Sequence, residues 1–353
     1  MSAYRKPFSP RAVFIRLLKT IHGCIPFPLH FKYMAKLKRL LKSFSRLLTP
    51  IIILLVAAVL TASIWLSYET SKVPKAEYLV TPDKYGQLSA RGAQITDETW
   101  TNGDGSTSRG WLLKGTENAP AVILFHSYGA DRSHVLNLGV KLNEATNFTV
   151  LMPDARGHGE NPVVFNTTFG GAESEDALAA IAFLSGLKNT AGANFTSPKI
   201  GVYGVEMGAI AALYAAGKDE NVKALVADSV PNNSDDIVAS AVGKRFPFLS
   251  TVTSKLAQTG TYFYFFDGSY KRENLCNTAK LVANRKVLLL AGSDAPKLQD
   301  VTVKLIQCFP ESSKIDARTD LSPSGYSIIN ASIEQSESYD QKVIEFFRTN
   351  LSN

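Results

Sequence analysis

One long uncharged segment near the N-terminus dominates the hydrophobic pattern of the chain. It runs from Leu47 to Tyr68, between Arg46 and Glu69, and it is apolar on every helical face. Its 22 residues are enough for a helix to cross the roughly 30 Å hydrocarbon core of a bilayer. A cleaved signal peptide would carry a much shorter basic region before its apolar part. We therefore predict an uncleaved transmembrane signal anchor over residues 47–68.

Short apolar runs alternate with amphipathic segments in the rest of the chain. A polar stretch at residues 69–92, interrupted by proline and glycine, predicts a stalk. Two runs in which apolar and polar residues alternate lie on either side of Asn102–Gly105, and together they predict a β-hairpin. Further strands are predicted at AVILFHS, FTVLMPD, KIGVYG, VKALVADSV, KVLLLAG and SKIDART, and helices at 132–144, 173–187, MGAIAALYAAG and YDQKVIEFFRTNL. This alternation predicts an α/β domain with a mostly parallel, doubly wound sheet.

The positive charge of the chain is concentrated before the apolar segment. Residues 1–68 contain eleven Lys and Arg and no acidic residue, whereas the remainder has 27 basic and 31 acidic residues. The main body therefore gives no sign of a nucleic-acid surface. The positive-inside rule predicts a single-pass protein whose N-terminus is cytoplasmic and whose C-terminal domain is extracytoplasmic.

The basic arm, residues 1–46, also has a helical pattern near its end. Apolar Met34, Leu37, Leu41, Phe44 and Leu48 recur at three- and four-residue steps, with basic residues between them. Such a helix can lie on an anionic inner leaflet, but the same charges would also be present if they only set the topology. Both interpretations stay open at this stage.

The cysteines give no sign of a metal site. The chain has Cys24, Cys276 and Cys308, with no CxxC pair and no Cys/His spacing typical of metal ligands. We expect no metal and no cofactor. Cys276 and Cys308 can pair in an oxidising compartment if the fold brings them together, which the sequence does not establish.

Four motifs, in the right order and on the right predicted elements, resemble the α/β-hydrolases. NGDGSTSRGWLL is similar to the opening hairpin of that family, LFHSYGADRSH to its oxyanion loop, LMPDARGHGEN to the following strand and turn, and GVEMG to its nucleophile elbow. The resemblance is closest to the serine-aminopeptidase and esterase-like branch and covers about Gln94 to Leu351. It implies an α/β-hydrolase fold over residues 93–353, with a small cap in the insertion at about 231–284.

The resemblance also indicates that the catalytic groups are degenerate. Glu206 stands at the elbow apex, where the family has its nucleophilic serine. The backbone N–H groups of Met207 and Tyr128 would form the oxyanion hole, with His126 and Ser127 at the rim of the pocket. The catalytic histidine is expected after the last strand, yet no histidine follows His158. Asp294 is the nearest candidate for the acid, one residue before the usual position.

Three hypotheses follow for the elbow. In the first, which we favour, the Glu206 carboxylate folds back onto the N–H groups of Met207 and Tyr128, and the protein binds an unknown ligand or partner without catalysis. In the second, a divergent esterase or peptidase has a site rebuilt around Glu206, Asp294 and one of His126 and His158. A glutamate nucleophile would still need a histidine to activate water, and it is one methylene longer than the aspartate that related enzymes use. In the third, another hydroxyl such as Ser127 is the nucleophile.

An aromatic run lies in the predicted cap. It comprises Tyr262, Phe263, Tyr264, Phe265 and Phe266. These rings can line a cleft for a lipid or an acyl chain, or they can form the core between the cap and the sheet. We favour the core, which is the usual place for such a cluster.

Overall fold

The computed structural model describes residues 27–74, 77–86, 92, 94–160 and 164–352. The basic arm up to residue 26, with Cys24, lies outside the described residues, as do parts of the predicted stalk. The first described element is helix α2, Phe27–Ser71, which is longer at both ends than the predicted span. Its segment Lys36–Ser71 is long and apolar enough to cross a membrane, which suggests a single-pass membrane anchor.

The last turns of α2 belong to the folded domain. The chain divides into two compact units between Thr61 and Ala62. Beyond this point Ser63, Ser67 and Ser71 are completely buried, because they share one face of the helix at four-residue steps. Residues 69–71, predicted to begin a stalk, are thus the last residues of the helix, with Thr70 and Ser71 buried, and a short helix α3, Pro82–Gly86, follows.

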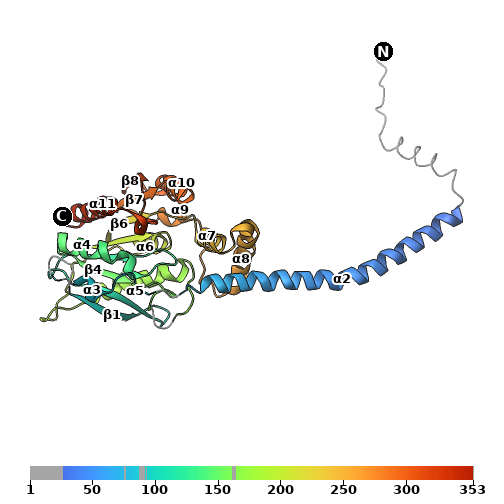
Figure 1. The fold of residues 1–353 in the computed structure, drawn as a ribbon, viewed down its shortest axis with the longest axis horizontal. Helices are drawn as coiled ribbons and strands as arrows, with labels where there is room; N and C mark the ends of the chain where they lie inside the picture. Colours follow the sequence, from blue (N-terminus) through green and yellow to red (C-terminus); the bar gives the residue numbers. More distant parts are fainter. Residues whose placement is uncertain (1–26, 75–76, 87–91, 93, 161–163, 353) are drawn as a thin grey trace, which may run out of the picture. The chain divides into compact units, whose positions relative to one another are not determined.

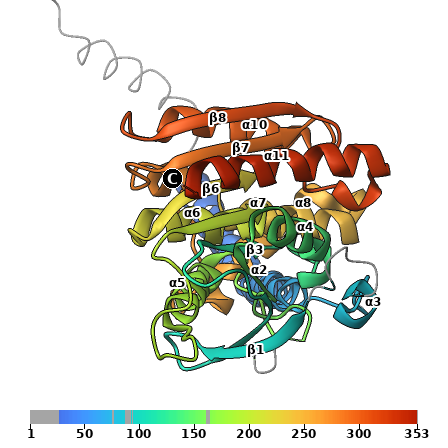
Figure 2. The ribbon, with the colours of Figure 1, turned by 90° about the vertical axis from the view of Figure 1, so that its left-hand side faces the viewer.

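An eight-stranded sheet forms the centre of the domain. Its order is β1-β2-β4-β3-β5-β6-β7-β8, and Figures 1 and 2 show it running from β1 at the bottom to β8 at the top. The strands are β1 Ile95–Thr101, β2 Thr107–Leu113, β3 Ala121–Phe125, β4 Thr149–Pro153, β5 Ile200–Val205, β6 Val222–Asp228, β7 Lys286–Gly292 and β8 Lys314–Leu321. The first two form the predicted hairpin, β2 pairs antiparallel with β4, and all later pairs are parallel.

Helices cover both faces of the sheet. One core contains α4, Leu136–Thr146, and α11, Ile333–Leu351, and Figure 2 shows α11 crossing in front of the strands. The other core contains α5 Gly171–Gly186, α6 Met207–Lys218, α9 Leu275–Ala279 and α10 Pro296–Leu305. Short 3₁₀ turns lie at Arg132–Val135, Ile306–Cys308 and Ile328–Asn330. Consecutive residues of the central strands enter opposite cores, which is why these strands are uninterrupted apolar runs in the sequence.

Two helix starts differ from the sequence prediction. The predicted helix at 132–144 begins as a 3₁₀ turn and becomes α-helical only at Leu136. Helix α11 begins at Ile333, well before the apolar pattern that starts at Tyr339, because Ser332 and Gln335 form a capping box. Cap chemistry therefore sets this start rather than hydrophobic periodicity.

The insertion predicted as a cap holds α7, Ser234–Arg245, a 3₁₀ turn at Pro247–Leu249, and α8, Ser250–Tyr264, as well as α9. Its aromatic run is split. Phe265 is buried in the core, as expected, and Tyr264 is partly buried against it, but Tyr262, Phe263 and Phe266 are exposed. The core interpretation is therefore wrong for these three rings. Cys276 and Cys308, which the sequence left unassigned, form a disulfide that ties α9 to the 3₁₀ turn after α10.

Helices α2 and α8 pack closely through small residues. The Ser67 hydroxyl donates to the carbonyl oxygen of Ala257 at 2.7 Å. A Cβ atom on Gly260 would overlap the carbonyl group of Ser63 and the hydroxyl of Ser67. Only glycine permits this approach of the two backbones, as at helix contacts inside membranes.

We predict that Gly260→Ala destabilises the full chain by about 1–3 kcal/mol, because the added methyl group must push backbone away. The matched control is Gly243→Ala in α7, where an added Cβ has open space and only Ser250 lies near, at 3.8 Å. That change should be neutral or stabilising by up to about 1 kcal/mol. Unfolding of both variants in detergent micelles measures the difference. Equal stabilities would contradict the close packing of α2 on α8.

Candidate functional site

A tight turn between β5 and α6 places Glu206 at its apex. Glu206 has φ 49° and ψ −105°, a backbone conformation that side-chain-bearing residues rarely adopt. The turn is tight because Gly204 faces the backbone of Gly208, and Gly208 faces the carbonyl groups of Phe125 and His126. A Cβ at either glycine would overlap backbone, so the spacing in GVEMG follows from the geometry of the turn.

The Glu206 carboxylate is buried against backbone N–H groups. The side chain is only 3% exposed, and its Oε2 accepts a hydrogen bond from the Tyr128 N–H at 3.0 Å. Burial raises the pKa of Glu206 from 4.5 to about 7, while the N–H groups of Tyr128 and Met207 and the charge of Lys244 act in the opposite direction. The structure therefore brings together three of the residues that the sequence singled out, Glu206, Tyr128 and Met207.

A large cleft opens beside Glu206. Its volume is about 900 Å³, and apart from Glu206 it is lined by the cap and by α10. Its charged lining residues are Glu206, Asp236, Asp300, Lys244, Lys255, Lys297 and Lys304. None of the five residues of the aromatic run belongs to this lining, so the aromatic acyl-binding cleft considered above is not what the described residues form. The sequence analysis missed the lysines because three separate helices bring them to one cleft.

Both histidines near the elbow have their ring nitrogens engaged by backbone. Nε2 of His126 accepts from the N–H of Ala155 at 3.0 Å, and its Nδ1 lies 2.8 Å from the carbonyl oxygen of Ser127. Nε2 of His158 accepts from the N–H of Gly129 at 3.1 Å, and its Nδ1 lies 3.0 Å from the carbonyl oxygen of Arg156. Burial lowers the pKa of both rings, that of His158 to about 3. Both are therefore neutral imidazoles that hold loops in place.

Asp294 follows β7 and contacts the loop after β8. Its Oδ1 accepts from the backbone N–H of Ser324 at 3.0 Å, and its Oδ2 accepts from the Ser324 hydroxyl at 2.8 Å. The next residue, Gly325, donates its N–H to Asp228 at 2.8 Å, and the Tyr339 hydroxyl donates to the same carboxylate oxygen at 2.6 Å. The family resemblance places a histidine in this loop. The structure has instead the buried Ser324, which hydrogen-bonds both carboxylate oxygens of Asp294. No local sequence signal marks this pairing, because the partners lie thirty residues apart.

Asp154 and Arg156 order the turn after β4. Asp154 accepts hydrogen bonds from the N–H groups of Arg132 and Glu160 at 2.9 and 3.0 Å. Arg156 forms a bidentate pair with Asp176. Ser127 contributes its carbonyl oxygen to the local backbone, and among the described residues no imidazole or carboxylate hydrogen-bonds its hydroxyl.

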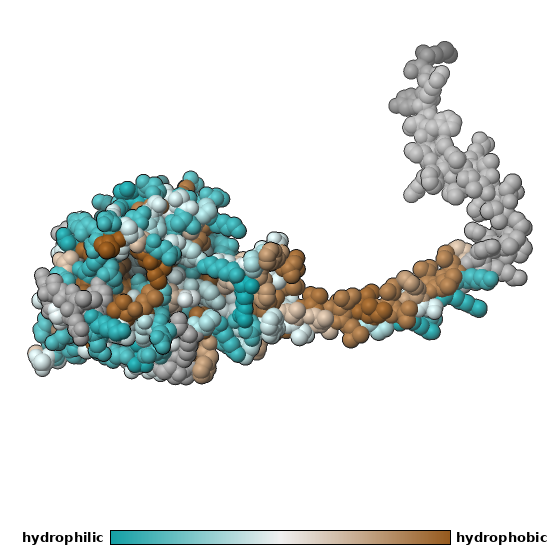
Figure 3. All heavy atoms as spheres, in the orientation of Figure 1, coloured by the Kyte–Doolittle hydropathy of each residue, from teal (hydrophilic) through white to brown (hydrophobic). Residues whose placement is uncertain are grey.

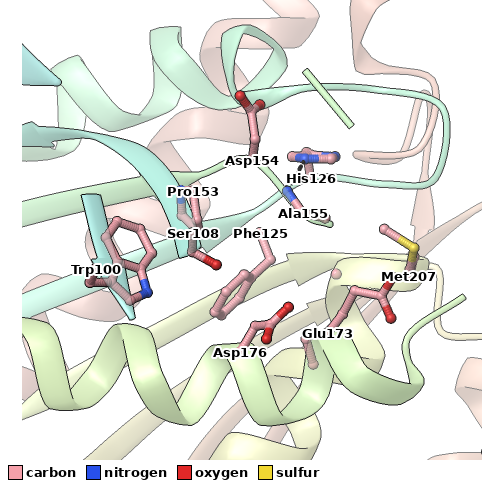
Figure 4. Close-up of a pocket in the computed structure, with 12 residues that line it drawn as sticks. Trp100, Ser108, Phe125, His126, Pro153, Asp154, Ala155, Glu173, Asp176 and Met207 are labelled. Atoms are coloured by element: carbon pink, nitrogen blue, oxygen red, sulfur yellow. Dashed lines mark hydrogen bonds between the residues drawn. The ribbon is translucent and has the colours of Figure 1, made fainter. Parts of the chain in front are cut away.

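A second, very small cavity lies under the elbow, between Trp100, Phe125, Met207 and neighbouring side chains (Figure 4). Figure 4 also shows His126 beside Ala155, to which it is hydrogen-bonded. The cavity measures about 20 Å³, which is room for one water molecule and not for a ligand. Within the described part of the chain, no group of three or more His, Cys, Asp or Glu is arranged to hold a metal ion.

Comparisons with known proteins relate this architecture to solved structures only. No family model and no curated protein matches the sequence. An esterase from Pyrococcus furiosus superposes with a TM-score of 0.58 at 20% identity, covering 79% of this chain and 97% of that chain. An α/β hydrolase from a Penicillium species gives 0.54 at 14% identity, with 74% and 100% covered, and a hypothetical protein from Pseudomonas aeruginosa gives 0.55 at 17% identity, with 78% and 100% covered. The strand order, the elbow turn and these superpositions together establish that the chain has the fold of the α/β-hydrolase superfamily.

Proposed function

We propose that this chain is a membrane-anchored, non-catalytic α/β-hydrolase-like protein that binds a ligand or partner at the Glu206 cleft. The observation that carries the proposal is the 3.0 Å hydrogen bond from the Tyr128 N–H to Glu206 Oε2. In a hydrolase of this fold, that N–H would stabilise the oxyanion of the substrate. Here the protein's own side chain holds the position, and a substrate carbonyl would have to displace it.

The surroundings of Glu206 support the same proposal. Nucleophilic catalysis needs a base that activates the nucleophile or the attacking water. His126 and His158 have both ring nitrogens bound to backbone, so neither has a free lone pair to accept a proton. The carboxylate of Asp294 is engaged by Ser324, and Asp294 is not part of the cleft lining.

One observation favours the alternative of a divergent hydrolase. A buried carboxyl group with a pKa of about 7 is suited to general acid–base catalysis at neutral pH. This alternative requires Glu206 to leave the N–H of Tyr128 and turn into the cleft. It differs from the main proposal in a measurable way, since it makes any activity depend on Glu206.

The orientation in the membrane is the second part of the proposal. The basic residues before the span favour a cytoplasmic N-terminus, and the basic arm has the composition to contact an anionic inner leaflet. The Cys276–Cys308 disulfide supports an oxidising compartment for the domain. Both observations are consistent with an extracytoplasmic domain.

We predict that the full chain in detergent micelles does not hydrolyse short- or long-chain activated esters or aminoacyl substrates above the level of Glu206→Ala. The reason is that Glu206 occupies the oxyanion position and that neither His126 nor His158 has a free ring nitrogen. Initial rates over a range of substrate concentrations test this. Turnover that is lost in Glu206→Ala would establish the divergent hydrolase instead, and turnover that survives in Glu206→Ala would point to another hydroxyl such as Ser127.

The second prediction concerns pH. Glu206 has a pKa of about 7 when folded against 4.5 ordinarily, so between these values the folded chain binds more protons than the unfolded chain. Stability contributed by Glu206 is therefore full below pH 4.5 and is lost as the pH rises through 7, by roughly 2–4 kcal/mol. Glu206→Gln keeps an oxygen acceptor for the Tyr128 N–H but does not ionise.

Denaturant unfolding of wild type and Glu206→Gln at several pH values between 4.5 and 8 measures this effect. We expect wild type to lose stability relative to Glu206→Gln as the pH rises. Other titrating groups, such as Asp176, cancel in the difference between the two proteins. A pH-independent difference would mean that Glu206 is not buried as described.

The topology prediction is tested in intact cells with a membrane-impermeant thiol reagent. Cys24 should be labelled only after permeabilisation. Leu281→Cys, at an exposed position of the domain, should be labelled without it when Cys24 is replaced by serine. The reverse pattern would place the domain in the cytoplasm.

A further inference from the structure

We propose that the cap helix α8 lies on the bilayer surface and inserts an apolar face into the leaflet at the C-terminal end of the span. The proposal rests on three features of the domain from Ala62 onward. These are the contacts between α8 and the end of α2, the exposed apolar side chains of α8, and the polar side chains by which α8 lines the cleft. It does not depend on whether Glu206 is catalytic.

The first feature is the contact between α8 and the last turns of α2. Ala257, Gly260 and Tyr264 represent two turns of α8, yet they contact α2 only between Ser63 and Tyr68. At 1.5 Å per residue, that stretch of α2 is only about 8 Å long. Helix α8 therefore contacts α2 only near its C-terminal end, and Figure 1 shows the two helices crossing at the end of the domain.

These contacts lie within the apolar segment itself. Residues 63–68 are the last residues of the uncharged stretch that ends at Tyr68. On the other side of this turn of α2, Ile64 and Trp65 are exposed. A tryptophan at this place is typical of the boundary between hydrocarbon and headgroups. Helix α8 contacts these same residues and is thereby assigned to the same boundary.

The second feature is an unpartnered apolar face. Phe248 is 100% exposed and Phe266 is 87% exposed, and Leu249, Val252, Tyr262 and Phe263 are also exposed. Phe248, Val252, Thr259, Phe263 and Phe266 follow each other at helical spacing along the 3₁₀ turn, α8 and the turn after it. Figure 3 shows hydrophobic surface at the end of the domain where α8 lies. Soluble monomeric proteins rarely expose several large apolar side chains side by side to water.

The remaining faces of α8 are occupied. Ala257, Gly260 and Thr261 are buried toward α2 and the core, and Thr251, Ser254 and Gln258 line the Glu206 cleft. Lys255, between the cleft side and the apolar side, can extend its amine to the headgroups while its stem stays in apolar surroundings. This division into an apolar face and a polar face is that of an interfacial helix. We commit to lipid as the occupant because the residues of α2 that α8 contacts, 63–68, are the end of the apolar segment.

The test uses the full chain, with Cys24→Ser, reconstituted in phosphatidylcholine vesicles. Cys276 and Cys308 form a disulfide, so a single introduced cysteine carries a polarity-sensitive fluorophore. The test positions are Phe248→Cys and Val252→Cys, both exposed. The control is Leu281→Cys, also exposed, which neighbours Gly217 at the far end of α6 from the elbow.

We expect blue-shifted emission at positions 248 and 252, strong quenching by a lipid with a nitroxide on a shallow acyl carbon, and protection from aqueous iodide. Position 281 should show red-shifted emission and iodide quenching. Iodide quenching at all three positions would overturn the proposal. Blue-shifted emission without nitroxide quenching would also overturn it, since it would mean that a second protein copy covers the face.

A second variant checks the cause. With Phe248→Asp and Leu249→Asp together, a label at position 252 should become accessible to iodide, because two charges oppose insertion. Phe248 is fully exposed and Leu249 is 63% exposed, so the fold has little packing to lose there. Unchanged nitroxide quenching at position 252 in this variant would contradict insertion of the 3₁₀ turn.

Discussion

Tyr128 connects the end of the apolar helix to the elbow through two hydrogen bonds. Its backbone N–H donates to Glu206, and its hydroxyl donates to the carbonyl oxygen of Thr70 at 2.7 Å. Its ring lies between His158 and Phe169, at centroid distances of 5.7 and 5.5 Å. The N–H of Thr167 completes this connection by donating to Ser71 at 2.9 Å. The last carbonyl groups of α2 are thus satisfied by the loops that border the candidate site. A displacement of α2 would move the donor of Glu206 as well.

If a ligand binds at the elbow as proposed, its entry and the protonation of Glu206 are interdependent. A ligand that presents an oxyanion to the Tyr128 N–H must compete with Glu206 for that donor. The displaced Glu206 side chain would then enter the cleft, where solvent and Lys244 favour its ionised form. Anion binding would therefore release Glu206 from a site that favours its neutral form. Four lysines in the cleft lining would assist an anionic ligand and the displaced carboxylate alike.

The sequence predicted those parts of the fold that depend on local pattern. Turn residues predicted the hairpin, and apolar runs predicted the parallel strands. The family resemblance predicted the elbow glycines and the contact between Glu206 and the Tyr128 N–H. The pairing of Asp294 with Ser324 was not predictable, because it depends on the path of a loop after β8. The aromatic run was misjudged for a related reason. A run of five rings looks like core, but on a helix end at most one or two can face inward, and here Phe265 does.

Hydropathy places the boundary between the apolar segment and the domain after Tyr68, whereas the domain already buries residues from Ser63 onward. Ser63, Ser67 and Thr70 lie inside or next to an apolar segment, yet they are buried against the domain. The Thr70 hydroxyl donates to the carbonyl oxygen of Leu66 at 2.6 Å. The Ser67 hydroxyl lies within 3.0 Å of the carbonyl oxygens of Ser63 and Ala257. Because these hydroxyls need no water, the same turns suit lipid on one side and protein on the other. Packing of the domain therefore begins at Ser63, before the apolar segment ends at Tyr68.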